Sequence, residues 1–139
     1  MRRIVIDTNL YIDWLNAGKH EAVLFRRDAV KYMSAVVMME LFAGASSEPD
    51  RKRLRGIMAS FAKTGRILLP SIVVYEEAGN VLRKLQASRG YNPTGASSLV
   101  NDVLIALSAR SIGATVITQN ERDFVSIQGI QSFKLEVVA

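Results

Sequence analysis

The sequence predicts an α/β fold, a three-layer α/β/α sandwich around a mostly parallel central sheet of four or five strands. Short apolar runs, such as Arg3–Ile6 and Ala114–Thr118, alternate along the chain with longer segments of helical periodicity. Polar residues follow both runs directly, which is typical of buried parallel strands that end in loops. We therefore expect helices on both faces of one sheet.

Length and composition indicate a single domain over residues 1–139. Of these residues, 49% are hydrophobic and 22% are charged, which is enough apolar material for an ordinary core. No stretch approaches the roughly 20 apolar residues that cross a bilayer, and Asp7 interrupts the first apolar run too early for a signal peptide. We expect a cytoplasmic protein without a membrane partner.

The net charge and the cysteine and histidine content limit the metal sites, partners and reactions to be expected of this chain. The chain has no cysteine, which excludes disulfides and thiolate metal sites. Its formal net charge of +5 favours a polyanionic partner such as nucleic acid, or an acidic protein that covers the same surface. The single histidine, His20, does not support the two-histidine chemistry of many ribonucleases.

The first part of the chain predicts a strand, two helices and a second strand. Arg3–Ile6 is rich in β-branched residues and ends in polar ones, as a buried strand does. Leu10–Leu15 predicts a short helix that ends toward Gly18. A second helix is expected over Glu21–Asp28, and a second strand over Lys31–Ser34.

The middle of the chain predicts two helices and a strand. Ala35–Ala45 is an apolar helix that Ser34 is placed to cap. After a loop and helix start at Ser46–Asp50, the segment Arg51–Lys63 has an apolar face and a basic face, which predicts an amphipathic helix. Arg66–Pro70 is the next strand candidate.

The last part of the chain predicts two further helices and two strands. A long helix is expected from Ser71 to about Ser88, and Gly90–Gly95 breaks the helical pattern. The next helix begins at Ser97 or Ser98 and ends near Gly113, and a strand follows at Ala114–Thr118. Asn120–Phe124 is expected to form a loop or short helical turn, and Ser132–Val137 a weaker strand. No repeat or linker interrupts this alternation.

Three carboxylates stand alone in apolar stretches. Asp7 follows the first strand, Glu40 lies within the apolar helix, and Asp102 lies within the helix that begins near Ser97. Neither Glu40 nor Asp102 has a basic residue one helical turn away. Unpaired burial of a carboxylate costs several kcal/mol or raises its pKa. If the three converge, a divalent cation is their natural counter-ion.

The expected topology brings polar residues to one edge of the sheet. Asp7 and the segment Thr118–Asp123 each follow a strand, and ligands collect at the carboxyl ends of parallel strands. Glu40 and Asp102 have apolar neighbours at helical spacing, so both should point inward. Oxygen ligands without histidine or cysteine favour Mg²⁺ or Mn²⁺ over zinc.

Four short motifs, in this order and on these elements, resemble those of PIN-domain nucleases. They are Ile4-Val5-Ile6-Asp7-Thr8-Asn9, Met39-Glu40-Leu41, Asn101-Asp102 with Ile105-Ala106, and Thr118-x-Asn120-x-x-Asp123-Phe124. The compact length resembles the VapC-type toxins of type II toxin–antitoxin pairs. The resemblance implies a metal-dependent endoribonuclease in which Asp7, Glu40 and Asp102 are catalytic acids and the core ligands of one or two Mg²⁺ or Mn²⁺ ions.

The fourth motif departs from the family pattern. Many PIN domains have an aspartate where Asn120 stands, and here the acid is retained only at Asp123, which the resemblance implies is a fourth catalytic acid. An amide lowers the charge available to a second metal, so we expect one firmly held ion. Thr8 and Thr118 are expected to hydrogen-bond the acids or the scissile phosphate, and Asn9 to brace the loop after the strand.

The resemblance also implies partners: an RNA substrate, a second copy of the chain in a homodimer, and a VapB-like antitoxin whose segment lies in a groove near the acids. Candidate surfaces are Met38–Phe42 and the helix from Arg51 to Phe61. Basic residues that could hold the RNA backbone are Arg51, Lys52, Arg53, Arg55, Arg83, Lys84, Arg89 and Arg122. A cluster such as Arg51 to Arg55 is more often a plain solvated face than a binding patch.

Each acid also has a structural explanation. Asp7 could form only an Asx-type turn at the end of a strand, Glu40 could be a solvated helix residue, and Asp102 could cap a helix. Asn120 and Asp123 are residue types that a turn would also select.

Other functions stay open as well. An aspartate after the first strand also serves as a phosphatase nucleophile, but haloacid-dehalogenase-like sites need a second aspartate two residues later, where this chain has Asn9. The remaining alternatives are a PIN-like nuclease of RNA processing without an antitoxin, and a non-catalytic binding protein that retains the fold.

Overall fold

The computed structural model describes residues 1–90 and 97–139. Within these residues, one sheet contains β1 Arg2–Ile6, β2 Ala29–Ser34, β3 Ile67–Leu68, β4 Thr115–Thr118 and β5 Lys134–Val137. Every neighbouring pair of strands is parallel, and their order is β3-β2-β1-β4-β5. The predicted α/β class and the mostly parallel sheet are confirmed.

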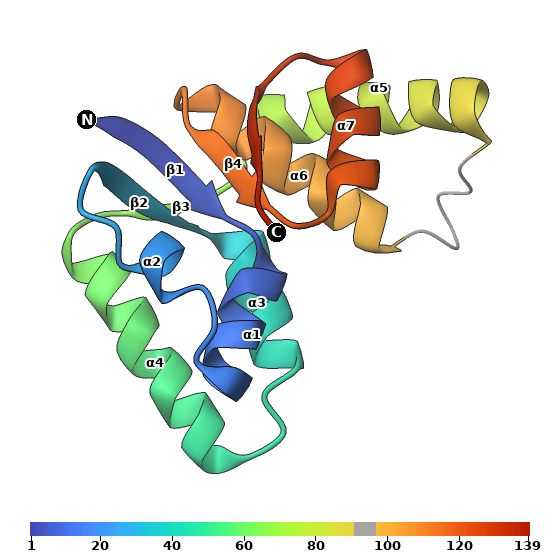
Figure 1. Ribbon diagram of the computed structural model, residues 1–139. Helices are drawn as coiled ribbons and strands as arrows, with labels where there is room; N and C mark the ends of the chain where they lie inside the picture. Colours follow the sequence, from blue (N-terminus) through green and yellow to red (C-terminus); the bar gives the residue numbers. More distant parts are fainter. Residues whose placement is uncertain (91–96) are drawn as a thin grey trace.

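The helices form a layer on each side of this sheet. In chain order they are α1 Thr8–Ala17, α2 Glu21–Leu24, α3 Ala35–Ala43, α4 Glu48–Lys63, α5 Ile72–Arg89, α6 Ser97–Ser111 and α7 Glu121–Ile130. Helices α1, α2 and α4 lie on one side, with α3 beside α1, and α5, α6 and α7 lie on the other (Figure 1). None of the described helices is long and apolar enough to cross a membrane.

The order of the strands reverses between β1 and β4. The chain moves outward from β1 through β2 to β3, and then returns to β4 on the other side of β1. In open parallel sheets, ligands bind in the crevice at the carboxyl ends of the strands where such a reversal occurs. The residues at that position are Asp7, which follows β1, and Thr118, which ends β4.

Serine hydroxyls cap three of the helices. The Ser34 hydroxyl accepts hydrogen bonds from the backbone N–H groups of Val36 at 3.1 Å and Val37 at 3.4 Å, which confirms the predicted cap of α3. The hydroxyls of Ser47 and Ser71 cap α4 and α5 in the same way. The sequence therefore fixes these helix starts locally.

Glycines in the left-handed conformation end two helices. Gly18 ends α1 with a φ of 67°, and Gly90 ends α5 with a φ of 70°. Both were predicted as breaks. The rest of the predicted break, residues 91–95, lies outside the described residues.

One predicted helix is shorter than expected. The helix over Glu21–Asp28 ends at Leu24, because the backbone leaves the helical conformation at Phe25. Strand β2 then begins at Ala29, two residues before its predicted start.

The segment Asn120–Phe124 was predicted as a loop or short turn, but it begins the full helix α7. Gly129 and the three β-branched residues of α7 (Val125, Ile127 and Ile130) lower the intrinsic helix propensity of this segment. Phe124 and Ile127 nevertheless lie about one turn apart and are fully buried, so tertiary packing stabilises the helix.

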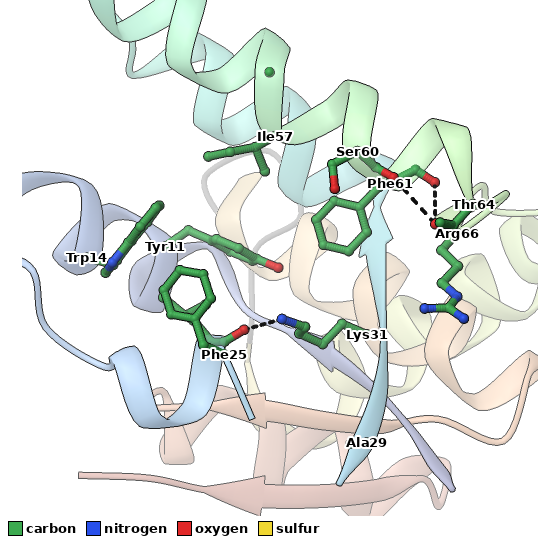
Figure 2. A pocket seen from close by; sticks show the side chains of 12 residues that line it. Tyr11, Trp14, Phe25, Ala29, Lys31, Ile57, Ser60, Phe61, Thr64 and Arg66 are labelled. Atoms are coloured by element: carbon green, nitrogen blue, oxygen red, sulfur yellow. Dashed lines mark hydrogen bonds between the residues drawn. The ribbon is translucent and has the colours of Figure 1, made fainter. Parts of the chain in front are cut away.

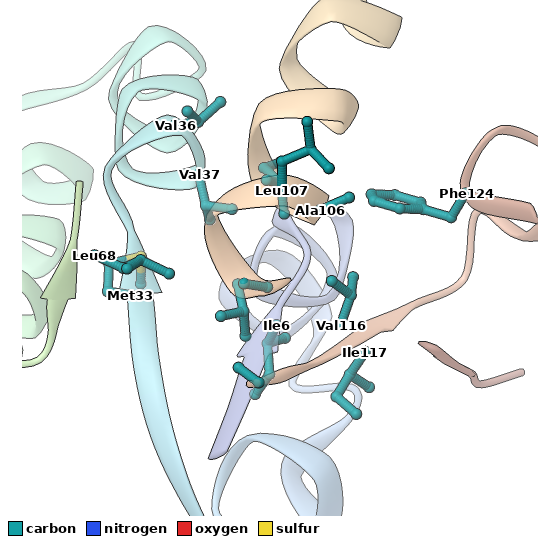
Figure 3. Packing of buried hydrophobic residues seen from close by; sticks show 14 of the residues in the cluster. Ile6, Met33, Val36, Val37, Leu68, Ala106, Leu107, Val116, Ile117 and Phe124 are labelled. Atoms are coloured by element: carbon teal, nitrogen blue, oxygen red, sulfur yellow. The ribbon is translucent and has the colours of Figure 1, made fainter. Parts of the chain in front are cut away.

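The two central strands carry the core of the molecule. Ile6 in β1 and Val116 in β4 are almost completely buried and pack with side chains from both helix layers, among them Val37 and Phe124 (Figure 3). Because β1 and β4 are apolar on both faces, their carboxyl ends are rigidly positioned. The residues that directly follow these strands are therefore held in fixed positions.

Replacing Phe124 by alanine should lower the free energy of unfolding by about 3 to 5 kcal/mol, since its ring is fully buried. Val125 is 46% exposed, so Val125→Ala should cost less than about 0.5 kcal/mol. Urea denaturation of both variants measures the difference. Equal, small losses would contradict the packing of α7 against the core.

Candidate active site

Asp7 is held at the end of β1 by both of its neighbouring elements. Its backbone N–H donates a 2.9 Å hydrogen bond to the carbonyl of Ile117 in β4. Its carboxylate caps α1, since Oδ1 accepts a 2.8 Å hydrogen bond from the backbone N–H of Thr8. Oδ2 accepts a 2.7 Å hydrogen bond from the Thr118 hydroxyl. The carboxylate is buried, with both oxygens engaged.

Glu40 reaches the same place from α3. Its Oε1 accepts a 2.7 Å hydrogen bond from the hydroxyl of Thr8. Its Oε2 accepts a longer hydrogen bond, 3.4 Å, from the Nδ2 of Asn101 in α6. Glu40 is therefore half-buried and tied to two other elements, which excludes the alternative that it is a freely solvated helix residue.

Asp102 enters from α6 and is 7% exposed. Its Oδ2 accepts a 3.3 Å hydrogen bond from the Nδ2 of Asn120, which lies between β4 and α7. Because Asp102 lies in the second turn of α6, it does not cap that helix. Both helical acids point inward, as predicted from their apolar neighbours.

Asn120 is the N-cap of α7 and connects two of the acids. Its Oδ1 accepts a 3.3 Å hydrogen bond from the backbone N–H of Asp123. Its Nδ2 donates to Oδ2 of Asp123 at 3.1 Å as well as to Asp102. Its backbone N–H donates a 2.9 Å hydrogen bond to the Thr118 hydroxyl, which in turn donates to Asp7.

These contacts form one continuous set of hydrogen bonds, which we call the acid network. It consists of Asp7, Thr8, Glu40, Asn101, Asp102, Thr118, Asn120 and Asp123. The elements that contribute to it are far apart in the sequence but meet at the reversal of strand order. Four carboxylates thus share one region with only hydroxyl and amide donors between them.

The acids repel one another in this region. Burial first, and then the charges of Asp7, Asp123 and Glu40, raise the pKa of Asp102 to about 8. Burial also raises the pKa of Asp7, although the hydrogen bonds from Thr118 and Thr8 oppose this change. Strongly perturbed carboxyl groups in a crevice are typical of functional sites.

The donor chemistry of the acid network fits a hard divalent cation. Carboxylate oxygens are the ligands that Mg²⁺ and Mn²⁺ prefer, and a cation would offset the repulsion that raises the pKa of Asp102. Within residues 1–90 and 97–139, however, no group of three histidine, cysteine, aspartate or glutamate side chains is already arranged to hold a metal ion. Ion binding therefore requires the acid side chains to move from the positions that they take here.

Most of the predicted site residues converge, and one does not. Asp7, Glu40, Asp102, Asp123, Thr8, Thr118 and Asn120 all belong to the acid network. Asn9 is exposed in the first turn of α1, and the loop that it was expected to brace does not exist, because the helix begins at Thr8.

Sequence reasoning assigned no role to Asn101, although it lies next to Asp102 in one of the motifs. Its contact with Glu40 joins α3 to α6, two helices that are 61 residues apart at these positions. No local pattern predicts that meeting. The sequence feature that could have indicated a role for Asn101 is its position directly before Asp102, a solitary acid in an apolar stretch.

Three of the eight basic residues suggested for RNA binding make other contacts. Arg51 and Arg55 both pair with Glu48 on the surface of α4. Arg53 lies over the ring of Trp14, with its guanidinium carbon 5.6 Å from the ring centroid. These contacts are those of a solvated helix face. Arg122, by contrast, is exposed beside the acid network.

A groove begins one helical turn from Asp7, at Tyr11 of α1. It has a volume of about 440 Å³ and lies between α1, α2, β2 and α4 (Figure 2). Its walls include the aromatic rings of Trp14, Phe25 and Phe61. The ammonium group of Lys31 donates a hydrogen bond to the carbonyl of Leu24 at its floor.

The hydroxyl of Tyr11 is buried in this groove without a hydrogen-bond partner among the residues that the structure describes. Burial raises the pKa of this phenol beyond its usual range, so it stays a neutral donor. An unpaired buried donor is costly to the folded state.

Comparison with known proteins gives a consistent result. The family model described as PIN domain matches residues 4–130. The chain is 27% identical over 134 residues to Ribonuclease VapC1 of Rickettsia felis, and the match covers 92% of both proteins.

Solved structures share the fold over nearly the whole chain. A chain of DNA-bound VapBC from Salmonella typhimurium has a TM-score of 0.69 and 23% identity, covering 99% of this chain and 98% of that one. A chain of VapBC-5 from Mycobacterium tuberculosis has a TM-score of 0.66 and 24% identity, covering 99% and 100%. The family match confirms the resemblance to PIN domains that the motifs indicated.

Without divalent cations, stability should fall as the pH rises. Because the pKa of Asp102 is about 8 in the folded chain and near 3.8 when unfolded, the folded state binds more protons between these values. We expect the free energy of unfolding in EDTA to drop by about 2 kcal/mol or more between pH 5 and pH 9. Urea denaturation at several pH values measures it.

Asp102→Asn is the control for this pH dependence. The variant should lose most of the slope, because its amide does not titrate, while Asp7 contributes a smaller slope of the same sign. A wild-type stability that is constant or rises over this range would contradict the repulsion among the acids.

Proposed function

Because this chain belongs to the PIN domain family, we propose that it is a Mg²⁺- or Mn²⁺-dependent endoribonuclease, the toxin of a toxin–antitoxin pair. One observation carries the proposal: four carboxylates from four elements converge at the reversal of strand order. Relatives described as a ribonuclease and as components of VapBC complexes support it.

We assign three of the four acids to cation binding and the fourth, Asp123, to a separate role. Asp7, Glu40 and Asp102 would hold the cation, because they approach from β1, α3 and α6 and surround one region. Asp123 lies at the first turn of α7, where the positive end of the helix dipole favours its charge. We assign it to orienting the attacking water or the leaving group.

The chemistry is hydrolysis of a phosphodiester bond. When bound, a divalent cation supplies Lewis-acid polarisation of the phosphate and lowers the pKa of a coordinated water. The Thr8 and Thr118 hydroxyls donate to Glu40 and Asp7 and fix the orientation of these carboxylates. Arg122 is placed to contact the RNA backbone beside Asp123, which gives affinity without sequence preference.

The phosphatase alternative loses support at the residue two positions after Asp7. The exposed Asn9 occupies the place of the second aspartate that such sites need.

The groove at Tyr11 is our candidate for the antitoxin. We propose that it receives a segment with an aromatic or aliphatic side chain next to an acidic one. The rings of Trp14, Phe25 and Phe61 would pack on the apolar group, and the ammonium group of Lys31 would pair with the carboxylate. Since Tyr11 and Asp7 share a face of α1, the segment could continue to the acids.

This assignment moves the partner surface relative to the sequence-based prediction. The helix from Arg51 to Phe61 contributes Ile57 and Phe61 to the groove. Met38–Phe42, in contrast, does not line it. The homodimer implied by the resemblance stays a prediction.

RNA cleavage tests the proposed activity. Structured RNA incubated with the purified chain and Mg²⁺ or Mn²⁺ should be cut, and EDTA should abolish the cutting. Asp7→Asn and Asp102→Asn should each slow it by about 100-fold or more, because each removes a cation ligand. Asp28→Asn is a control, since Asp28 is an exposed acid at the opposite end of β2. Cleavage in EDTA would contradict the proposal.

Peptide selection tests the groove. Random peptides displayed on phage and selected on the wild-type chain should be enriched in an apolar residue next to an acidic one. Gly56→Trp should abolish their binding, because Gly56 lines the groove, a Cβ added there meets no neighbour, and the indole ring would occupy the space of the peptide. Gly79→Trp is the matched control, a helical glycine with the same open surroundings on α5. Enrichment of basic peptides, or equal binding to both variants, would exclude this occupant.

A further inference from the structure

Asn120 holds two acids of the site with a single nitrogen. Its Nδ2 donates to Oδ2 of Asp102 at 3.3 Å and to Oδ2 of Asp123 at 3.1 Å. An amide nitrogen carries two hydrogens and a partial positive charge, so it can serve two carboxylates at once. It occupies the position between them that a cation would otherwise take.

The helix cap decides which way this amide faces. Oxygen and nitrogen of an asparagine are assigned from their surroundings, and here the backbone N–H of Asp123 donates to Oδ1 at 3.3 Å. With Oδ1 committed to the start of α7, Nδ2 must point toward the two carboxylates. The orientation is therefore a consequence of the fold and needs no metal to maintain it.

An amide nitrogen in this orientation cannot ligate a hard cation. Mg²⁺ and Mn²⁺ take oxygen ligands, and the N–H groups of Asn120 point at the oxygens that a second ion would need. The first ion keeps carboxylate oxygens that Asn120 does not engage, because the Asn120 amide donates to Oδ2 of Asp102 and leaves its Oδ1, while Asp7 and Glu40 receive their hydrogen bonds from Thr118, Thr8 and Asn101.

We infer that Asn120 replaces a second cation between Asp102 and Asp123, so that this chain binds one divalent ion and positions its fourth acid by hydrogen bonding. Asn120 is thus a positioning residue. The inference rests on the proposed metal dependence. It adds that a single exchange, Asn120→Asp, converts a one-ion site into a two-ion site.

Calorimetric titration with MnCl₂ tests this inference on the intact chain. The wild type should bind one Mn²⁺, and Asn120→Asp should bind two, the second about tenfold or more tighter than any further binding to the wild type. Electron paramagnetic resonance gives an independent readout, since two ions in one site show spin coupling. Aspartate also caps helices well, so the variant should fold.

Two further variants control for charge alone. Asn101→Asp adds the same charge to the acid network, but within the described residues the Asn101 amide donates to Glu40 and not to Asp102 or Asp123, so this exchange should not create a second site. The exchange of both residues, Asn120→Asp with Asp123→Asn, keeps the total charge of the wild type and should bind one ion. In EDTA, Asn120→Asp should melt at a lower temperature than the wild type and regain stability with Mn²⁺.

The outcomes separate the inference from the proposed function. One ion in the wild type and two spin-coupled ions only in Asn120→Asp support the inference. Two ions in the wild type, one ion in Asn120→Asp, or a second ion in Asn101→Asp as well would overturn it while leaving a metal-dependent nuclease intact. If no variant binds Mn²⁺, the proposed metal dependence fails and the inference fails with it.

Discussion

Repulsion among four carboxylates at one edge of the sheet is the constraint on which the site depends. Asp7, Glu40, Asp102 and Asp123 come from four different elements, and burial with mutual repulsion raises the pKa of Asp102 to about 8. The fold tolerates this arrangement because hydroxyl and amide groups donate to each acid. A bound divalent cation would relieve this repulsion, and this relief favours its binding. The carboxylates that the proposed cation needs therefore lower the free energy of unfolding when no cation is bound.

The local devices that start helices also build the site. Asp7 caps α1 and Asn120 caps α7, so both side chains are fixed by the backbone that follows them. The parallel pairing of β1 with β4 brings these two helix starts together, and Thr118 links them through its hydroxyl. Because the strands beneath are buried on both faces, the caps cannot move independently. A rigid base thus supports acids whose side chains still have to rotate to close around an ion.

The local sequence pattern was sufficient to predict the acids of the site, but not the residues that form hydrogen bonds with them. Asp7 and Asp102 were recognisable from sequence, because a solitary carboxylate in an apolar run conflicts with its surroundings. The contact of Asn101 with Glu40 was not, because it depends on α3 meeting α6 across the end of the sheet. Helix α7 was missed because its intrinsic propensity is low and packing forms it, so the role of Asn120 as its cap was hidden as well.

A crystal structure with bound Mn²⁺ tests the central claim most directly, since anomalous scattering locates the ion without reference to activity. The account predicts one anomalous peak at the reversal of strand order, about 2.0 to 2.3 Å from carboxylate oxygens of Asp7 and Asp102. Glu40 should contact the ion directly or through a water. A fully occupied crystal with no peak there, or with its peak away from these acids, would contradict the account.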